Sequence, residues 1–421
     1  MRSTRALLPL TVVVFAAACG GSEASAGGTT GSGEASAGST TGSGEASAGS
    51  TTGSGGASAG STTGSGEASA GSATGSGGAA SSGVGGAGGA GGAGGAGGMV
   101  EGPGTDTTVI PFARTHFYFT SDDDQRVVDA LASFPSTGTY ERVTLHLSLE
   151  CPSGGCDPWS RLASLGLVTA KDPAGDTLIE LMRFVTPYHV GASWDLDVTD
   201  LRPLLAGEVT LRAFVDTSVG PGSPYGDGWL LTASFEMKGG VPAKIPVGVI
   251  PVWGPRRVVY GDPARPIAGA APLADVPLPV GASSYALRSF ITGHGQGNAG
   301  NCAEFCEKEH TLTVGAVPHA ERIWRDDCAT TAAPGQQGTY RYARAGWCPG
   351  ADVRPWTVDI TADVAGTGAA KVAYDVAGYE NTCRPDSTLC DGCTLGSGCT
   401  YDGATHTEPG YELSTVLIGY R

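Results

Sequence analysis

Apolar and polar residues alternate with a period of two along several short stretches of the chain. The clearest stretches are 142–149 and 209–216, and a third covers 413–417. Alternation of this kind is typical of half-buried β-strands, and Gly/Pro-rich turns separate the stretches. Helical periodicity is scarce, with residues 124–134 as the best candidate for a helical turn or two. The pattern therefore predicts an all-β protein built from antiparallel sheets.

The part of the chain that carries this pattern is too long for one compact core. Roughly 320 residues follow position 98, and single hydrophobic cores stop growing near 250–300 residues. The Pro- and Gly-rich stretch 246–261 is the expected junction. We therefore predict two β-sandwich domains, 99–248 and 249–421.

The first residues have the composition of an export signal. A basic start, Met1-Arg-Ser-Thr-Arg5, precedes an apolar run that ends at Ala18, and Cys19 follows directly. The apolar run is too short to span a bilayer as a helix. We predict a lipoprotein signal peptide over 1–18 with Cys19 as the lipidated residue, which would anchor an exported protein to the bacterial cell envelope, at the surface or in the periplasm. The alternative is a plain signal peptide followed by a chance cysteine.

Residues 19–98 have a composition that cannot form a core. An eleven-residue unit rich in Gly, Ser, Ala and Thr repeats over 31–74, and Gly-Gly-Ala triplets continue to Gly98. Almost every side chain is small or polar, which predicts a disordered tether. A Gly/Ser-rich coil of this length has an r.m.s. reach of roughly 50 Å. A glycosylated stalk and a repeat adhesin are the alternatives.

Charge and cysteine content narrow the class of protein. The formal net charge is −16, and repulsion from phosphate argues against nucleic acid as a partner. Of the eleven cysteines, ten remain once Cys19 is set aside, and an even number in an exported protein indicates disulfides. The last four cysteines are Cys383, Cys390, Cys393 and Cys399. They could form disulfides in three pairings or bind zinc, and an oxidising setting favours disulfides.

Two closely spaced cysteine pairs flank charged residues. Cys151 and Cys156 precede the turn Asp157-Pro-Trp-Ser-Arg161, and Cys302 and Cys306 enclose Glu304. A disulfide that closes so few residues contributes only about 2 kcal/mol on the loop-entropy model. Such rings are therefore better suited to fixing the local direction of the backbone than to stabilising the whole fold.

At these residues the chain resembles a known family. The matching motifs occur in one order from about residue 105 to 421: Cys156-Asp-x-Trp-x-Arg161, Arg183-Phe-Val-Thr-Pro-Tyr188, Cys302-Ala-Glu-x-Cys306 and Ala345-Gly-Trp-Cys-Pro-Gly350. They resemble the peptide:N-glycosidase F family, bacterial amidases that cut N-glycans from asparagine. The resemblance implies two side-by-side antiparallel eight-stranded jelly rolls, no cofactor, no metal, and disulfides Cys151–Cys156, Cys302–Cys306 and Cys328–Cys348.

The resemblance also implies the chemistry of the site. Hydrolysis of the amide between asparagine and the first N-acetylglucosamine needs an activated water, a stabilised oxyanion and a proton for the departing glycosylamine. Glu304 matches a family glutamate near the reacting amide, with a structural ion pair to Arg344 as its alternative. Asp216 takes the place of another family glutamate, and a solvated strand residue is its alternative. Ser160 stands where the family has its principal catalytic aspartate.

Five further residues match family residues in or beside the cleft and are candidates for substrate binding: Asp157, Trp159, Arg161, Arg344 and Trp347. The faces of the two tryptophans suit sugar rings, and core packing explains either of them equally well. For Asp157 we favour the structural alternative, a turn residue whose carboxylate accepts backbone N–H groups.

A neutral hydroxyl at position 160 cannot act as a general base at ordinary pH. Two hypotheses follow, a tethered N-glycan amidase with an altered centre and a catalytically inactive lipoprotein that binds glycans or glycoproteins. Either takes an N-glycosylated protein, peptide or glycan as partner, and a monomer is expected. A copper monooxygenase shares the double jelly-roll architecture but needs clustered His and Met ligands. The seven histidines here are scattered, and within the folded region the methionines are Met182 and Met237.

Overall fold

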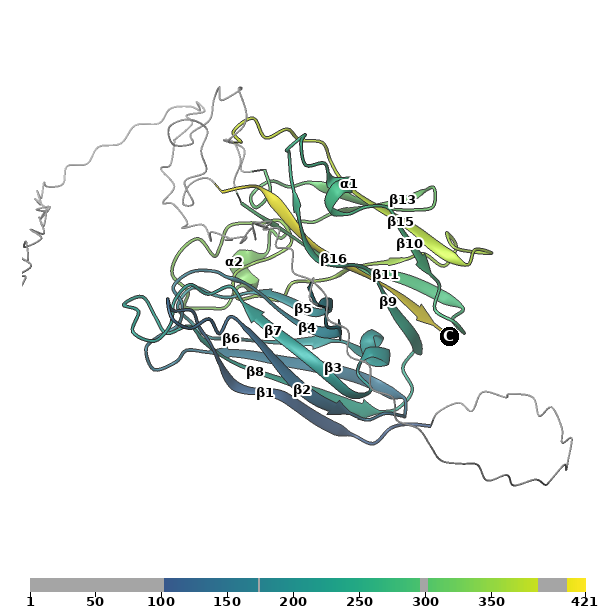
Figure 1. Cartoon of the computed structure of the whole chain (residues 1–421), viewed down its shortest axis with the longest axis horizontal. Coiled ribbons are helices and arrows are strands. Elements are labelled where there is room, and N and C mark those ends of the chain that lie inside the picture. The colour runs from purple at the N-terminus through teal and green to yellow at the C-terminus, as the bar shows by residue number, and fades with distance from the viewer. Residues whose placement is uncertain (1–101, 173–174, 296–301, 385–406) are drawn as a thin grey trace, which may run out of the picture. The chain divides into compact units, whose positions relative to one another are not determined.

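The computed structural model describes residues 102–172, 175–295, 302–384 and 407–421 (Figure 1). The predicted signal peptide, Cys19 and the predicted tether lie outside these residues, as do Cys390, Cys393 and Cys399. Within the described part of the chain, no helix is both long enough and apolar enough to cross a membrane.

The first half of the described chain folds into two four-stranded sheets. One has the order β1-β8-β3-β6 and the other β2-β7-β4-β5, with antiparallel pairing throughout. A 3-10 helix, η1, spans Thr199–Leu204. The strands are β1 (Thr107–Phe117), β2 (Val127–Phe134), β3 (Tyr140–Glu150), β4 (Leu162–Ala170), β5 (Thr177–Val185), β6 (Ala192–Asp197), β7 (Gly207–Val215) and β8 (Trp229–Gly239).

The second half forms another pair of four-stranded antiparallel sheets, in the orders β14-β11-β16-β9 and β10-β15-β12-β13. Two one-turn helices, α1 (Ile267–Ala270) and α2 (Cys328–Thr331), connect strands. The predicted pair of antiparallel eight-stranded jelly rolls is confirmed. The strands are β9 (Pro246–Val259), β10 (Ala274–Pro277), β11 (Ser284–His294), β12 (Glu309–Val314), β13 (Val317–Arg322), β14 (Trp356–Asp359), β15 (Ala369–Val376) and β16 (Gly410–Tyr420).

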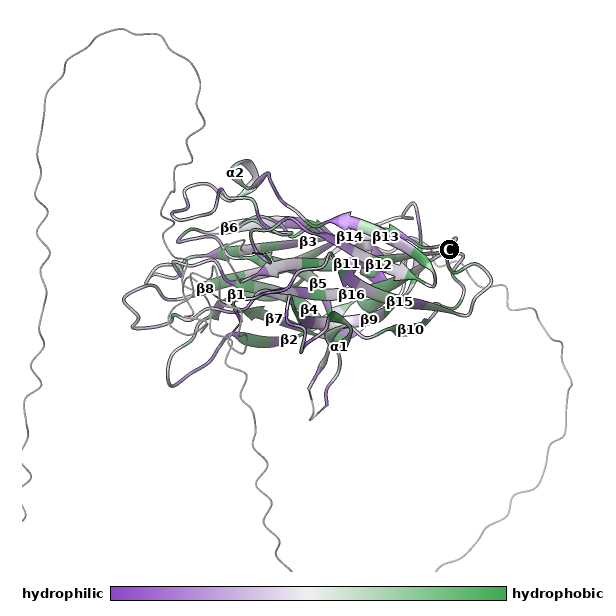
Figure 2. Cartoon of the chain, turned by 90° about the horizontal axis from the view of Figure 1, so that it is seen from above, coloured by the Kyte–Doolittle hydropathy of each residue, from purple (hydrophilic) through white to green (hydrophobic). Residues whose placement is uncertain are grey.

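The alternating pattern explains how the first sandwich closes. In β3 every second residue from Val143 to Leu149 is buried, and the residues between them are accessible. The neighbouring strand β8 buries its own alternate residues from Trp229 to Met237 in the same core. Hydrophobic and hydrophilic colours accordingly alternate along the strands in Figure 2. Each sandwich thus has an apolar interior between its two sheets.

Two expectations from the sequence are wrong. Residues 124–134 contain no helix, because 127–134 form the edge strand β2, whose register on β7 places Ala132 and Phe134 in the core. The stretch 246–261 is not a junction. It forms β9, and the chain passes between the sandwiches at 240–245. The prolines of β9 fit because it is an edge strand with register shifts near Pro251 and Trp253.

A buried polar cluster joins the two sandwiches. Arg183 on β5 is bonded to the carboxylate of Glu180, with N···O distances of 2.6 and 2.8 Å. Its Nη1 donates across the interface to Thr292 Oγ1, at 3.1 Å, and to the carbonyl of Glu412. Ser414 Oγ donates to Glu180 from β16. These contacts fix β5 against the second sandwich.

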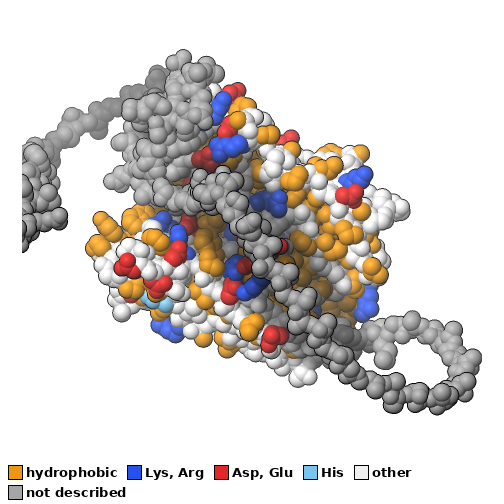
Figure 3. Space-filling view, viewed as in Figure 1, with side chains coloured by type: hydrophobic (Ala, Val, Ile, Leu, Met, Phe, Trp, Pro, Cys, Tyr) orange, Lys and Arg blue, Asp and Glu red, His pale blue; other side chains and the backbone are white. Residues whose placement is uncertain are grey.

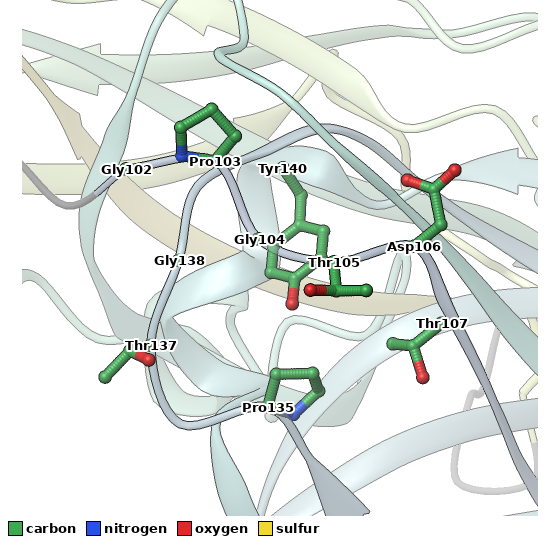
Figure 4. Close-up of a pocket in the computed structure, with 10 residues that line it drawn as sticks. All are labelled: Gly102, Pro103, Gly104, Thr105, Asp106, Thr107, Pro135, Thr137, Gly138 and Tyr140. Carbon is green, nitrogen blue, oxygen red and sulfur yellow. The ribbon is translucent and has the colours of Figure 1, made fainter.

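The surface mixes charges of both signs. Acidic and basic side chains are interspersed on the face shown in Figure 3. Exposed ion pairs are present in the described part of the chain, such as Lys238 with Glu141 at 3.0 Å. A pocket between residues 102–107 and 135–140 lies where the described chain enters the first sandwich (Figure 4). The carboxylate that lines it, Asp106, accepts the backbone N–H of Gly239 at 2.7 Å, and none of the predicted site residues lines this pocket.

Candidate functional site

The first cysteine ring holds a turn whose carboxylate is hidden. Cys151 and Cys156 are disulfide-bonded, and Asp157 directly after them is fully buried. Its Oδ1 accepts the backbone N–H of Trp159 at 2.9 Å. Its Oδ2 accepts hydrogen bonds from Arg161 Nε at 3.0 Å and from the hydroxyl of Thr217 at 2.6 Å. Asp157 therefore shapes the turn, which is the structural alternative we favoured, and its burial removes it from the candidate substrate-binding residues.

Arg161 is a buried residue that contacts several groups of this turn. The side chain is 6% exposed, and Nη2 donates to Ser218 Oγ while Nε bonds Asp157. Its guanidinium carbon lies 5.1 Å from the centre of the Trp159 ring, a cation–π contact. Trp159 remains partly exposed, so the structure leaves it accessible to a ligand while Arg161 fixes its orientation.

Ser160 connects this turn to the second sandwich. Its Oγ donates to the hydroxyl of Tyr188 at 3.1 Å, and that hydroxyl lies 3.2 Å from Thr339 Oγ1. Tyr188 is 5% exposed, and its backbone N–H donates to the side-chain oxygen of Gln336 at 2.9 Å. Ser160 is thus accessible, while the tyrosine that receives its hydrogen bond is held rigidly between the two sandwiches.

Glu304 and Arg344 complete the same chain of hydrogen bonds. Arg344 Nη2 donates to Thr339 Oγ1 at 3.0 Å, and Nε donates to Glu304 Oε1 at 3.1 Å. The third guanidinium nitrogen donates to the carbonyl of Tyr342. Arg344 is 1% exposed, whereas the Glu304 side chain is 17% exposed. Ser160 and Glu304, far apart in sequence, therefore belong to one site.

Burial sets the electrostatics of Glu304. Removal from water raises the pKa of its carboxyl, and the positive charge of Arg344 opposes this without reversing it. A carboxyl of this kind keeps its proton to higher pH than an ordinary glutamate. It is therefore a candidate proton donor over a wider pH range than an ordinary glutamate.

This raised pKa predicts a specific pH dependence of stability. Because the folded-state pKa lies above the ordinary value of 4.5, the contribution of Glu304 is largest below 4.5 and is lost as the pH rises through the raised value. Relative to Glu304→Gln, wild-type stability is expected to decline over that window. Urea midpoints of both proteins at a series of pH values measure the difference, and a difference that stays constant with pH would contradict the prediction.

Trp347 lies under the site rather than on its surface. It is 3% exposed, and its indole N–H donates to the carbonyl of Gly293 at 2.8 Å. Arg344 packs 4.8 Å from the ring centre, and His294 stacks on the ring at 5.3 Å. Trp347 therefore supports Arg344 from within the core, which corrects its assignment to substrate binding.

His294 lies beside the site, stacked on the ring of Trp347. Its Nε2 pairs with Thr292 Oγ1 at 2.9 Å. Burial, helped by the charges of Arg257 and Arg183, lowers the pKa of the imidazole well below its usual range, so the ring is neutral at pH 7. Its Nε2 bonds Thr292, whereas the Oγ of Ser160 bonds Tyr188, so the structure does not pair His294 with Ser160.

Asp216 belongs to a neighbouring cluster. Its carboxylate is 3.5 Å from Arg126 Nη1, and Arg126 pairs more closely, at 2.6 Å, with Asp124. The backbone N–H of Asp216 donates to the carbonyl of Leu162, two residues after Ser160. The strand therefore brings Asp216 near the turn, and Arg126 lies beside its carboxylate.

Two further cysteine pairs lie in the second sandwich. Cys328 is joined to Cys348, which ties α2 to the segment that carries Arg344. The sulfurs of Cys302 and Cys306 are in contact at 2.7 Å, so the backbone brings together the pair for which a disulfide is expected.

The cysteine-rich stretch near residue 390 is described only at its start. Cys383 is disulfide-bonded, which favours disulfides over zinc for this group. Among the residues that the structure describes, no three His, Cys, Asp or Glu side chains are grouped to hold a metal ion.

The structure also adds residues that the motifs did not single out. Tyr188 closes one of the quoted motifs, so a signal for it existed. Gln336 and Thr339 lie in a loop without any recognisable pattern, and their contribution depends on the packing of this loop against Tyr188. Together the site supplies a carboxyl whose pKa is raised by burial, Glu304, and a buried cation, Arg344. It also supplies the hydroxyls of Ser160, Tyr188 and Thr339.

The chain is similar in sequence to a known amidase and to its family model. The family model described as "Peptide-N-glycosidase F, C terminal" matches residues 270–389. The amidase peptide-N(4)-(N-acetyl-beta-D-glucosaminyl)asparagine amidase F of Elizabethkingia miricola is 28% identical over 242 residues, which are 54% of this chain and 66%, or just under two thirds, of that protein.

Two solved structures share the fold. PNGase F, a glycosylasparaginase from Flavobacterium meningosepticum, superposes with a TM-score of 0.60 and 22% identity over 75% of this chain and 96% of its own. PNGF-II superposes with a TM-score of 0.52 and 18% identity over 75% of this chain and 65% of its own.

Proposed function

We propose that this chain, a peptide-N-glycosidase F-like protein, binds the linkage between asparagine and the first N-acetylglucosamine of N-glycosylated proteins and hydrolyses its amide slowly. The observation that carries the proposal is the hydrogen-bonded chain from Ser160 through Tyr188, Thr339 and Arg344 to Glu304. It assembles groups from both sandwiches into one partly accessible site.

Glu304 has the central chemical role in this proposal. Its partly exposed carboxyl, with a raised pKa, can donate a proton to the departing glycosylamine or position the attacking water. Arg344 acts through Glu304, since its three guanidinium nitrogens are bonded to Glu304, Tyr342 and Thr339. Ser160 supplies a hydroxyl in place of a carboxylate, and loss of a positioned base typically costs 10²–10⁴-fold in rate.

A second candidate function is glycan or glycoprotein binding without hydrolysis. It is favoured by Ser160 itself, because a neutral hydroxyl is no general base at ordinary pH, and its Oγ is bonded to the hydroxyl of Tyr188. Under this proposal Glu304 and Trp159 would contact the sugar.

We further propose that the protein is exported and anchored to the bacterial envelope by a lipid on Cys19. The Gly/Ser-rich residues 19–98 would then hold the two sandwiches clear of the membrane surface. Glycoproteins of the surroundings would be the partners.

The full chain incubated with a denatured N-glycoprotein in ¹⁸O-water tests the function. Slow conversion of glycosylated asparagine to ¹⁸O-labelled aspartate is expected, with release of glycan as glycosylamine, both followed by mass spectrometry. A sample without the protein measures spontaneous background. Binding without conversion would establish the second candidate, and neither binding nor conversion would reject both.

A further inference from the structure

Arg288 on β11 is a buried arginine, and two of its guanidinium nitrogens have no hydrogen-bond acceptor. The residue is 6% exposed, and among the residues that the structure describes, none accepts a hydrogen bond from its Nε or Nη2. Burial lowers the pKa of the guanidinium, yet an arginine remains protonated at neutral pH. Because a buried charge loses its hydration, it is normally paired with a group of opposite charge. Arg288 therefore has the properties of one half of a buried ion pair.

Alternation along β11 places Arg288 on the face that is turned toward the first sandwich. Ala286, two residues before it, packs in the core of that sandwich, and Phe290, two residues after it, packs with a residue of β5. Leu287, between them, belongs to the core of the second sandwich. Val416, opposite Arg288 in register on β16, packs in the first core as well. Arg288 thus lies between the two sandwiches, among apolar side chains.

The buried charges around Phe290 do not balance. Two guanidinium groups lie near its ring, with the central carbon of Arg183 at 6.0 Å and that of Arg288 at 5.7 Å from the ring centre. Arg183 is paired with Glu180 at 2.6 Å, so these two charges compensate each other. The carboxylate of Glu180 also accepts from Ser414. The charge of Arg288 is the one left over.

The carboxylates of the first sandwich whose charge acts on Arg288 belong to Asp200 and Asp197, and both bond other groups. Asp200 is hydrogen-bonded to the hydroxyl of Tyr420. Asp197 Oδ1 accepts the backbone N–H of Thr199 at 2.9 Å and its hydroxyl at 2.6 Å. The Asp197 side chain is 53% exposed, so water screens its charge. Neither carboxylate accepts a hydrogen bond from Nε or Nη2 of Arg288.

We infer that Arg288 binds a small monovalent anion, such as chloride, between the two sandwiches. Nε–H and Nη2–H point the same way from one edge of the guanidinium, a fork that can hold one anion with two hydrogen bonds. A monovalent anion compensates one guanidinium, whereas a dianion would bring an unpaired negative charge into the interface. The apolar neighbours Ala286, Phe290 and Val416 suit a halide, which needs few directed bonds. The inference does not depend on the proposed reaction.

Stability of the full chain as a function of chloride concentration tests this site. Sodium chloride is exchanged for sodium gluconate, whose anion is far larger, so that ionic strength and general screening stay constant. Because an anion that binds only the folded protein stabilises it by mass action, each tenfold rise in chloride above the dissociation constant should raise the folding equilibrium constant about tenfold. Urea midpoints measure this rise.

The variant that removes the guanidinium is Arg288→Met. It should lose the chloride dependence and still fold, because apolar replacement of a buried ion is usually tolerated. Arg288→Lys keeps the charge without the fork and should reduce the dependence. If Arg288→Met does not fold, Arg288→Lys decides, and a dependence as steep as that of wild type would reject the site. Lys238→Met removes a cation that is 59% exposed and should behave like wild type.

Asp200→Asn separates an external anion from a carboxylate of the chain. If Arg288 binds chloride, this variant should keep the chloride dependence of wild type or show a steeper one. If Asp200 compensates Arg288 in solution, wild type would show no chloride dependence and Asp200→Asn would acquire one, which would overturn the inference. A wild-type midpoint that is independent of chloride, or an Arg288→Met protein with the dependence of wild type, would overturn it as well.

Discussion

Ser160→Asp is expected to raise the rate of glycopeptide amide hydrolysis by about 10²–10⁴-fold, the usual contribution of a positioned general base. The site around position 160 is otherwise assembled. Ser160 is partly exposed, and the hydroxyl of Tyr188 is within hydrogen-bonding distance. A carboxylate at this position would accept a hydrogen bond from the hydroxyl of Tyr188, whereas Ser160 donates one to it. Initial rates of release of a labelled glycan from a glycopeptide measure the gain.

Two further variants separate charge from shape. Ser160→Asn has nearly the size of aspartate without its basicity, so it should stay at the wild-type rate. Glu304→Gln in the Ser160→Asp background should remove most of the gain, because the reaction then lacks its second carboxyl group. If Ser160→Asp were no faster than Ser160→Asn in a folded protein, position 160 would not be the point at which this site differs from an efficient amidase.

The strands were predictable because their signal is local. Alternation along 142–149 and 209–216 reports which face of a strand is buried, and each of these stretches is a strand in the structure. The motif-based resemblance supplied the jelly-roll arrangement, since periodicity alone cannot order strands within a sheet. The strand β2 was missed because its outward positions include Val127 and Leu131, which blur the alternation.

The sequence predicted which residues belong to the candidate site, but not which of them are buried. Asp157 is kept from the surface partly by Thr217, a residue distant in sequence whose hydroxyl donates to its carboxylate. Trp347 is buried because β11 supplies the carbonyl that its indole N–H needs. Contacts between distant segments decided each case.

The cluster between the sandwiches leads to the second prediction, which concerns stability. Arg183→Met is expected to lower the free energy of unfolding by about 3–5 kcal/mol, the usual cost of leaving a buried charge without its partner. Both side chains of the Arg183–Glu180 pair are at most 3% exposed. Without Arg183, Glu180 keeps the hydrogen bond from Ser414, and Thr292 and the carbonyl of Glu412 lose a donor.

Guanidinium unfolding followed by circular dichroism measures this loss. Lys238→Met is the matched control, because its ion pair with Glu141 has side chains 59% and 52% exposed and should contribute less than about 1 kcal/mol. Adding Glu180→Leu to Arg183→Met should recover part of the loss, since it removes the unpaired carboxylate itself. A single variant as stable as the control would mean that the interface tolerates an isolated Glu180. The Arg183–Glu180 pair would then not be what holds β5 against the second sandwich. It would also not hold the turn that leads from β5 to Tyr188.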